Sequence, residues 1–304
     1  MHRRTFIQRI VNAGALASFS QVFTRGTASA VMIRHDVEER SYIGLGARDE
    51  FQAGRITMLD RRGNYTGVLI SNRHVLTVGH PIVGYLPAGE SQGAVSVKIR
   101  ILGADYETDH AVLHPQYDRI PHFGGADLAV IRLKAPGVSK LRPATIWSGG
   151  LKLGERFVGV GQGKSGTGRD NNEPKPDGIF RGYENTIDYM HPEKDSAEFR
   201  ADFDNGTEQF NTLSRALLGV EKEPYQGQSS KLPMPLEGTT AAGDSGSGVW
   251  VMRNDVYCLA GIASFRHFSM YGGQAGYADL SASKVWLNSV SQMENTPFAI
   301  VEKG

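Results

Sequence analysis

One serine stands in a glycine-rich stretch whose composition could support nucleophilic chemistry. Ser245 follows Gly243 and Asp244, precedes Gly246, and leads into the apolar run 249–251. Glycines allow tight turns whose backbone N–H groups point toward a ligand. A hydroxyl held on such a turn can act as a nucleophile when a base lies beside it. An ordinary surface turn has the same composition, so this stretch alone leaves both interpretations open.

A catalytic serine needs partners elsewhere in the chain. Its hydroxyl is a weak nucleophile near neutral pH, so a base must accept the proton during attack. Histidine suits this task because its pKa lies near neutrality, and a buried aspartate can stabilise the resulting imidazolium. Asp127 opens the apolar run 128–131, where an unpartnered carboxylate would be costly to bury. A capping aspartate at a strand entrance is the alternative.

Short apolar or alternating segments, separated by turn residues, predict the strands that would position these groups. They lie at 55–59, 65–71, 94–102, 127–133, 157–161, 181–187, 257–264 and 276–280. With 37 glycines in 304 residues, this pattern predicts an all-β protein. We expect Ser281 to cap a final amphipathic helix, with one face formed by Ala282, Val285, Trp286, Ser289 and Val290.

Two of these segments resemble the chymotrypsin-like serine proteases. Residues 67–80 are similar to that family's strand pair leading into its histidine, and residues 127–133, with the preceding His-Pro at 114–115, are similar to its aspartate segment. The resemblance covers roughly residues 51–290. It implies that His80 is the base, Asp127 the orienting acid and Ser245 the nucleophile, in the chain order that this family shows.

The resemblance also has departures. Thr66 and Pro81 stand where many members have a disulfide-forming cysteine pair, and Val78-Gly79 replaces two alanines. The single cysteine, Cys258, cannot close an internal disulfide. We expect His74, six residues before His80, to have a structural role.

The resemblance assigns further roles around the serine. The backbone N–H groups of Gly243 and Ser245 would form the oxyanion hole. Ser264 would support the acid from a strand that lines the primary substrate pocket. Thr239 stands where trypsin-like members carry an acid, which argues against a preference for basic side chains. Arg266 stands where glycine is usual; it would narrow the pocket, offer a cation to an acidic side chain, or point to solvent.

The implied architecture is two six-stranded antiparallel Greek-key barrels followed by a helix. The barrels would span about 31–140 and 141–281, and the helix 282–293, with the site in the cleft between the barrels. Residues 162–177 predict a surface loop and 213–228 a short helix and insertion, both without an assigned function. Oxygen-bearing residues at 201–207 lack the rest of a calcium loop, so we expect a hairpin turn there.

The first thirty residues resemble a twin-arginine signal peptide. They contain four arginines, no acid, a mildly apolar segment at 11–23 and a small-residue end, Ala28-Ser29-Ala30. A frayed basic terminus with a short amphipathic helix is the alternative. We therefore expect export to the periplasm or beyond. Cleavage after Ala30 would make Val31 the N-terminus, which could pair with Asp244 as new termini do in this family.

Composition also narrows the class of protein that the sequence can encode. A formal net charge of +1 gives no electrostatic reason to expect binding to nucleic acid. The sequence contains no run of about 18 apolar residues, so we expect no membrane span, and no membrane anchor after signal removal. We expect a monomeric serine endopeptidase of residues 31–304 that acts on proteins or peptides without a metal or cofactor. The alternatives are a protease-fold binding protein without turnover and an esterase-like hydrolase.

Overall fold

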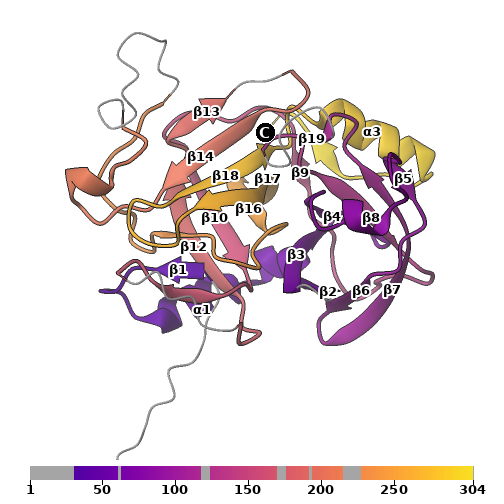
Figure 1. Cartoon of the computed structure of the whole chain (residues 1–304), viewed down its shortest axis with the longest axis horizontal. Helices are drawn as coiled ribbons and strands as arrows, with labels where there is room; N and C mark the ends of the chain where they lie inside the picture. Colours follow the sequence, from indigo (N-terminus) through magenta and orange to yellow (C-terminus); the bar gives the residue numbers. More distant parts are fainter. Residues whose placement is uncertain are drawn as a thin grey trace, which may run out of the picture.

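The computed structural model describes residues 31–60, 63–117, 124–169, 176–191, 194–214 and 227–303. Figure 1 shows two β lobes side by side, with the helix α3 (Lys284–Met293) beside the first lobe. The predicted signal peptide, residues 170–175 of the predicted surface loop, and residues 215–226 of the second insertion lie outside the described residues. No helix in the described part of the chain is long and apolar enough to cross a membrane.

The first lobe is a closed barrel of six antiparallel strands, because β7 pairs with both β6 and β8. The short β5 (Gln92–Gly93) extends this sheet from β7. In order around the barrel, the strands are β2 (Ile56–Asp60), β3 (Gly63–Leu69), β4 (His74–Thr77), β8 (Ala129–Leu133), β7 (Ala104–Leu113) and β6 (Lys98–Ile101).

The second lobe is a curved sheet that forms a half-barrel. The short strands β9 (Ile146–Trp147) and β19 (Ile300–Val301) join it beside β17. Along the sheet the main strands run β12 (Arg181–Thr186), β10 (Arg156–Gly161), β16 (Gly248–Arg253), β17 (Val256–His267), β18 (Gln274–Asp279), β14 (Glu198–Asp202) and β13 (Tyr189–His191). The helix and the two β lobes confirm the predicted fold class.

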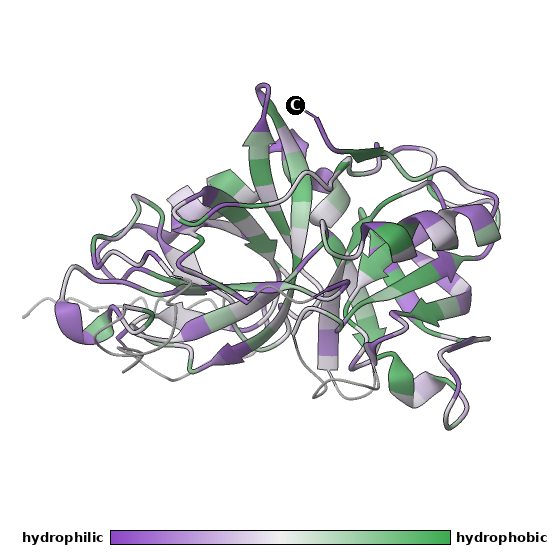
Figure 2. Ribbon diagram, turned by 90° about the horizontal axis from the view of Figure 1, so that it is seen from above, coloured by the Kyte–Doolittle hydropathy of each residue, from purple (hydrophilic) through white to green (hydrophobic). Residues whose placement is uncertain are grey.

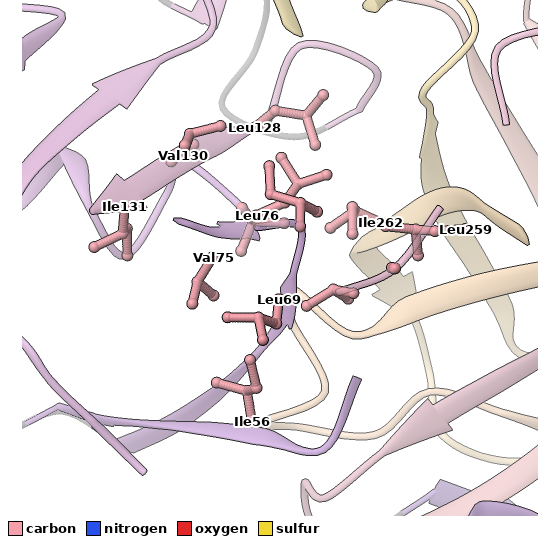
Figure 3. Close-up of a cluster of buried hydrophobic side chains, with 14 of the residues drawn as sticks. Ile56, Leu69, Val75, Leu76, Leu128, Val130, Ile131, Leu259 and Ile262 are labelled. Atoms are coloured by element: carbon pink, nitrogen blue, oxygen red, sulfur yellow. The ribbon is translucent and has the colours of Figure 1, made fainter. Parts of the chain in front are cut away.

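The two sheets share one apolar core. Figure 3 shows Leu76 and Leu128 of the first lobe beside Leu259 and Ile262 of β17, and all four side chains are fully buried. Burial of such side chains contributes about 1.5–3 kcal/mol each, so this seam fixes how the lobes sit against each other. A second buried cluster, inside the half-barrel, includes four aromatic rings that contact one another: Phe157, Tyr183, Phe199 and Tyr277.

The N-terminal segment packs on the second lobe, although it precedes the first barrel in the chain. Strand β1 (Val31–Ile33) lies between β11 (Ser165–Thr167) and β15 (Gly238–Thr239). Helix α1 (Glu39–Gly46) follows and packs on β12. The described residues also form three short 3₁₀ turns: η1 (Asp49–Gly54), η2 (Val83–Tyr85) and η4 (Glu208–Phe210). The domain boundary near residue 140 remains a prediction.

Two local expectations were wrong. Helix α3 begins after Ser283 rather than Ser281, and Val285 is 72 % exposed, whereas Trp286, Leu287 and Val290 face the core. The segment 201–207 is not a hairpin, because β14 ends at Asp202 and the chain continues into η4. Figure 2 shows hydrophobic segments along the strands of both lobes, whereas many loops and hairpin ends are hydrophilic.

Candidate active site

Asp127 and His80 form a paired acid and imidazole between the two lobes. Asp127 Oδ2 lies 2.8 Å from His80 Nδ1, and Oδ1 accepts the His80 backbone N–H at 2.8 Å. The Asp127 side chain is 1 % exposed and that of His80 is 19 % exposed. A carboxylate beside Nδ1 fixes the proton on that nitrogen, which leaves Nε2 as the proton acceptor. The pair therefore has the chemistry of an oriented general base.

Strand pairing explains why residues 47 positions apart meet. Strands β4 and β8 are antiparallel, with Thr77 opposite Ala129, so the end of one strand lies beside the start of the other. His80 follows β4 and Asp127 precedes β8. The residue directly before His80 is Gly79. A larger residue would not fit there, because a Cβ would lie 2.8 Å from the Tyr117 ring.

Ser264 connects the pair to the second lobe. Its hydroxyl donates to Asp127 Oδ2 at 2.7 Å and accepts the backbone N–H of Gly124 at 3.0 Å. The structure thus brings His80, Asp127 and Ser264 together, as the resemblance implied for their positions. Each Asp127 oxygen accepts a hydrogen bond, so protein donors replace the water that the carboxylate loses on burial.

The Ser245 turn is held in a conformation that favours glycine on both sides. Gly243 has φ +100° and Gly246 has φ +88°. A Cβ at Gly246 would lie 2.0 Å from the carbonyl oxygen of Thr66. Thr66 also donates its backbone N–H to Ser245 O at 2.9 Å and its hydroxyl to Gly243 O at 3.1 Å. The first barrel therefore fixes the turn directly.

A cavity of about 810 Å³ opens at this turn. Ser245, Gly243, Ser264 and Arg266 all line it, whereas Thr239 is buried in β15 opposite Met32 and is not among its lining residues. The other described lining residues are Gly125, His191, Ser196, Glu198, Arg200, Thr240, Ala241, Ala242, Ala263, Phe265 and His267. Ser264 thus contacts Asp127 and shares a cavity with Ser245.

Asp244 is buried behind the turn without solvent exposure. Burial raises its pKa to about 6, although backbone N–H donors and the charge of Arg266 oppose this rise. Its Oδ1 accepts the N–H of Gly163 at 2.6 Å and its Oδ2 that of Ala241 at 2.8 Å. Val31 is buried in β1, opposite Ser165. Strand β1 lies between β11, which follows Gly163, and β15, which precedes Ala241.

His74 occupies a different environment from His80. It is 1 % exposed, lies 2.8 Å from Ser71 Oγ through Nδ1, and lies 3.4 Å from Glu294 Oε2 through Nε2. Burial lowers its pKa, and Glu294 opposes this shift. Because His74 and Ser71 are buried, the Glu294 side chain is 6 % exposed and none of the three lines the described cavity, we interpret this histidine as structural.

Sequence reasoning missed three residues that shape the site: Thr66, Tyr117 and Gly124. Thr66 was noted only as a departure from the family pattern, and Tyr117 and Gly124 carried no prediction. The doublet Gly124-Gly125 before Asp127 was the available signal, because paired glycines mark close backbone approach. A Cβ at Gly125 would lie 1.6 Å from Ser196 O. In the described part of the chain, no group of three or more acidic, histidine or cysteine residues could hold a metal ion.

No family model and no curated protein matches the chain. Among solved structures, it is similar to neuropsin, a serine protease expressed in the limbic system of mouse brain. The TM-score is 0.51 at 15 % sequence identity, and the match covers 81 % of this chain and 97 % of neuropsin. This likeness shows the fold, which is that of the chymotrypsin-like serine proteases.

Proposed function

We propose that the protein is a serine endopeptidase that hydrolyses peptide bonds through an acyl-enzyme. One observation carries this proposal: the hydrogen-bonded series His80–Asp127–Ser264 ends in the wall of the cavity that also holds Ser245 and Gly243. The nucleophile and the turn N–H groups then line one space large enough for a substrate, and the oriented base is linked to the wall of that space through Asp127 and Ser264.

In this proposal, Ser245 Oγ attacks the peptide carbonyl carbon while His80 Nε2 takes the hydroxyl proton. Asp127 stabilises the imidazolium from 2.8 Å, and the N–H groups of Gly243 and Ser245 stabilise the oxyanion. His80 then protonates the leaving amine, which gives an acyl ester on Ser245. Water attacks this ester with His80 again as base, and His80 then gives the proton to Ser245 Oγ as the ester bond breaks and the carboxylic acid leaves.

Covalent labelling tests the nucleophile. We expect a fluorophosphonate to label the wild-type protein and to leave Ser245→Ala unlabelled. Ser247→Ala is the matched control, because the buried Ser247 hydroxyl has no hydrogen-bond partner in the described structure and its removal should preserve labelling. Full labelling of Ser245→Ala would exclude Ser245 as the nucleophile.

Substrate assays separate the alternatives. Turnover of casein together with a simple ester supports an endopeptidase. Turnover of the ester alone would favour an esterase-like hydrolase, and turnover of neither would favour a binding protein. An intact His80, Asp127, Ser245 and Gly243 favours the endopeptidase, because a binding module does not need all four residues.

We further propose that residues 1–30 direct export to the periplasm or beyond, and that the mature monomer acts on proteins or peptides without a cofactor. Cleavage after Ala30 would create an ammonium at Val31 that pairs with Asp244. The position of β1 between β11 and β15 supports this hypothesis. N-terminal sequencing of the active species tests it: activity in a chain that begins upstream of Val31 would contradict it.

A further inference from the structure

Three consecutive residues of β3 lie beside the proposed site. Thr66 donates hydrogen bonds to the carbonyl groups of Gly243 and Ser245. The carbonyl oxygen of Asn64 comes so close to the same turn that a Cβ at Gly243 would lie 3.2 Å from it. Figure 1 shows β3 where the two lobes meet. The residue between these two, Tyr65, therefore also lies next to the serine turn.

The Tyr65 ring packs against the imidazole of His80. The two ring centroids are 6.0 Å apart and the ring planes lie at 78°, which is an edge-to-face contact. Aromatic pairs prefer this geometry at centroid distances of about 4.5–7 Å. Tyr65 is also partly buried against the apolar core that the two lobes share, so the core holds its ring in place. Because successive side chains of a strand point to opposite faces, Tyr65 reaches the base while Thr66 reaches the serine turn.

The hydrogen bond between His80 and Asp127 leaves one rotation of the imidazole open. The contact of Nδ1 with Asp127 Oδ2 fixes one edge of the ring, yet the ring can still turn about that bond. Such a rotation moves Nε2, which must take the proton of Ser245 Oγ and later give it to the leaving amine. Proton transfer requires heavy atoms within about 2.6–3.2 Å, so a small displacement slows both steps. A second ring beside the imidazole limits this rotation.

The same contact joins two segments that no covalent bond connects. Thr66 on β3 and Pro81 after His80 stand where many chymotrypsin-like proteases form a disulfide. This chain has a single cysteine, Cys258, so the disulfide cannot form. The Tyr65–His80 pair connects the same two segments one residue earlier in each.

We propose that Tyr65 is a positioning residue for the general base, and that its ring keeps the His80 imidazole directed toward Ser245 through both proton transfers. This inference rests on the proposed endopeptidase function. Strand β3 thus holds both reacting side chains, the serine turn through Thr66 and the base through Tyr65. The described lining of the cavity does not include Tyr65, so its substitution should change the chemical steps rather than substrate binding.

Steady-state kinetics with a peptide substrate test this role. Tyr65→Leu should lower kcat about 2- to 10-fold with little change in KM, which is the range expected for the loss of one aromatic pair. Tyr65→Phe keeps the ring and should retain the wild-type kcat. Tyr106→Leu is the matched control, because Tyr106 of β7 is also partly buried against the same core but lies opposite Ile99 of β6.

Nuclear magnetic resonance separates positioning from a general effect on stability. The ring current of Tyr65 shifts the imidazole proton resonances of His80, which can be assigned by their loss in His80→Ala. These resonances should move in Tyr65→Leu and should stay in place in Tyr65→Phe and Tyr106→Leu. Urea unfolding of each variant measures stability independently.

The outcomes distinguish the two proposals. Labelling of the wild-type protein by fluorophosphonate, together with an unchanged kcat in Tyr65→Leu, would overturn the positioning role and leave the endopeptidase intact. An equal loss of kcat in Tyr65→Leu and Tyr106→Leu would show that Tyr65 acts only on stability. A loss in Tyr65→Phe as large as that in Tyr65→Leu would assign the effect to the hydroxyl group and overturn the role of the ring. Absence of labelling in the wild-type protein would overturn the proposed endopeptidase, and the positioning role with it.

Discussion

At the scale of single residues, Thr66 performs a task that the sequence did not suggest. It stands where many chymotrypsin-like proteases place a cysteine, yet here its hydroxyl and N–H bind the carbonyl groups of Gly243 and Ser245. Hydrogen bonds thus connect the first barrel to the serine turn in a chain with one cysteine. By holding the Gly243 and Ser245 carbonyl groups, Thr66 also fixes the peptide planes that directly follow the two whose N–H groups would face the oxyanion.

We therefore expect Thr66→Val to lower kcat about tenfold with little change in KM, because a less firmly held serine turn misplaces the oxyanion donors, which act mainly in the transition state. The free energy of unfolding should fall by about 1 kcal/mol, the usual net value of one hydrogen bond. Thr108→Val is the control: its buried hydroxyl donates to Val97 O within the first barrel. An equal loss of kcat in both variants would show that Thr66 acts only on stability.

Asp127→Asn should leave the fold intact and reduce kcat by about 10⁴-fold, as in enzymes with this arrangement, because an amide no longer holds the imidazole in the required tautomer. Steady-state kinetics with a peptide substrate and urea unfolding measure the two effects separately. Asp109→Asn, which affects an ion pair with Arg132, controls for loss of a carboxylate on the same barrel. Retained turnover in Asp127→Asn would remove Asp127 from the proposed mechanism.

At the scale of elements, the N-terminal segment is attached to the second lobe by a buried cation. Arg181 is fully buried in β12 and binds Glu39 of α1 at 2.7 Å and Asp177 at 3.0 Å. The backbones also approach closely, since a Cβ at Gly46 would lie 2.6 Å from the Gly182 N. This attachment holds β1 and Val31 near the segments that bind Asp244.

Glu39→Gln should reduce the free energy of unfolding by about 1–2 kcal/mol, because it leaves the buried Arg181 guanidinium with one carboxylate. The expected loss is modest because Glu39 itself is partly exposed, and water screens its charge. Hydrogen exchange should also become faster in β1. The neighbouring Glu38→Gln breaks only the exposed pair with Arg40 and should change neither quantity. If both variants behave alike, the Arg181 cluster does not attach the N-terminal segment.

The elements also show what the sequence could predict. The family resemblance placed His80 after a pair of strands, and the apolar run 128–131 placed Asp127 at the start of another, because such patterns are local in the sequence. The docking of β1 between β11 and β15 was not predictable, since it depends on contacts more than 130 positions apart. Likewise, Val285 fits the helical face by spacing but is exposed, because the packing neighbours of α3 decide which face is buried.

At the scale of the whole molecule, four buried carboxyl groups stand out: Asp188, Asp202, Asp204 and Glu237. Asp202 N–H donates to Asp188, and Asp204 N–H donates to Glu237. None of the four forms an ion pair among the described residues, and one oxygen of Asp204 has no hydrogen-bond partner there. Arg34 supplies a charge that acts on Glu237. Burial of unpaired carboxylates is costly, which raises the pKa of all four groups and favours their protonated forms.

The protonated cluster makes folding pH-dependent. Burial and neighbouring acids raise the pKa of Asp204 to about 9, and burial raises that of Glu237 to about 8. In the unfolded chain both carboxyls ionise near about pH 4, so above that pH the folded state binds more protons than the unfolded state. Stability therefore falls as the pH rises toward 8 and 9. Burial lowers the pKa of His74 and of His114, so these histidines affect stability only at acidic pH.

We expect the free energy of unfolding to fall by about 2 kcal/mol or more between roughly pH 7 and pH 9, because each carboxyl that stays protonated contributes up to ~1.4 kcal/mol per pH unit. Urea unfolding at several pH values in this range measures the slope. Asp204→Asn keeps the shape of the protonated side chain without its titration, so its stability should depend less on pH. Asp195→Asn is the control, since Asp195 lies outside the buried cluster. In the wild-type protein, stability that stays constant or rises over this pH range would contradict the prediction. A pH dependence that is the same in Asp204→Asn as in the wild-type protein would mean that Asp204 is already ionised in the folded protein.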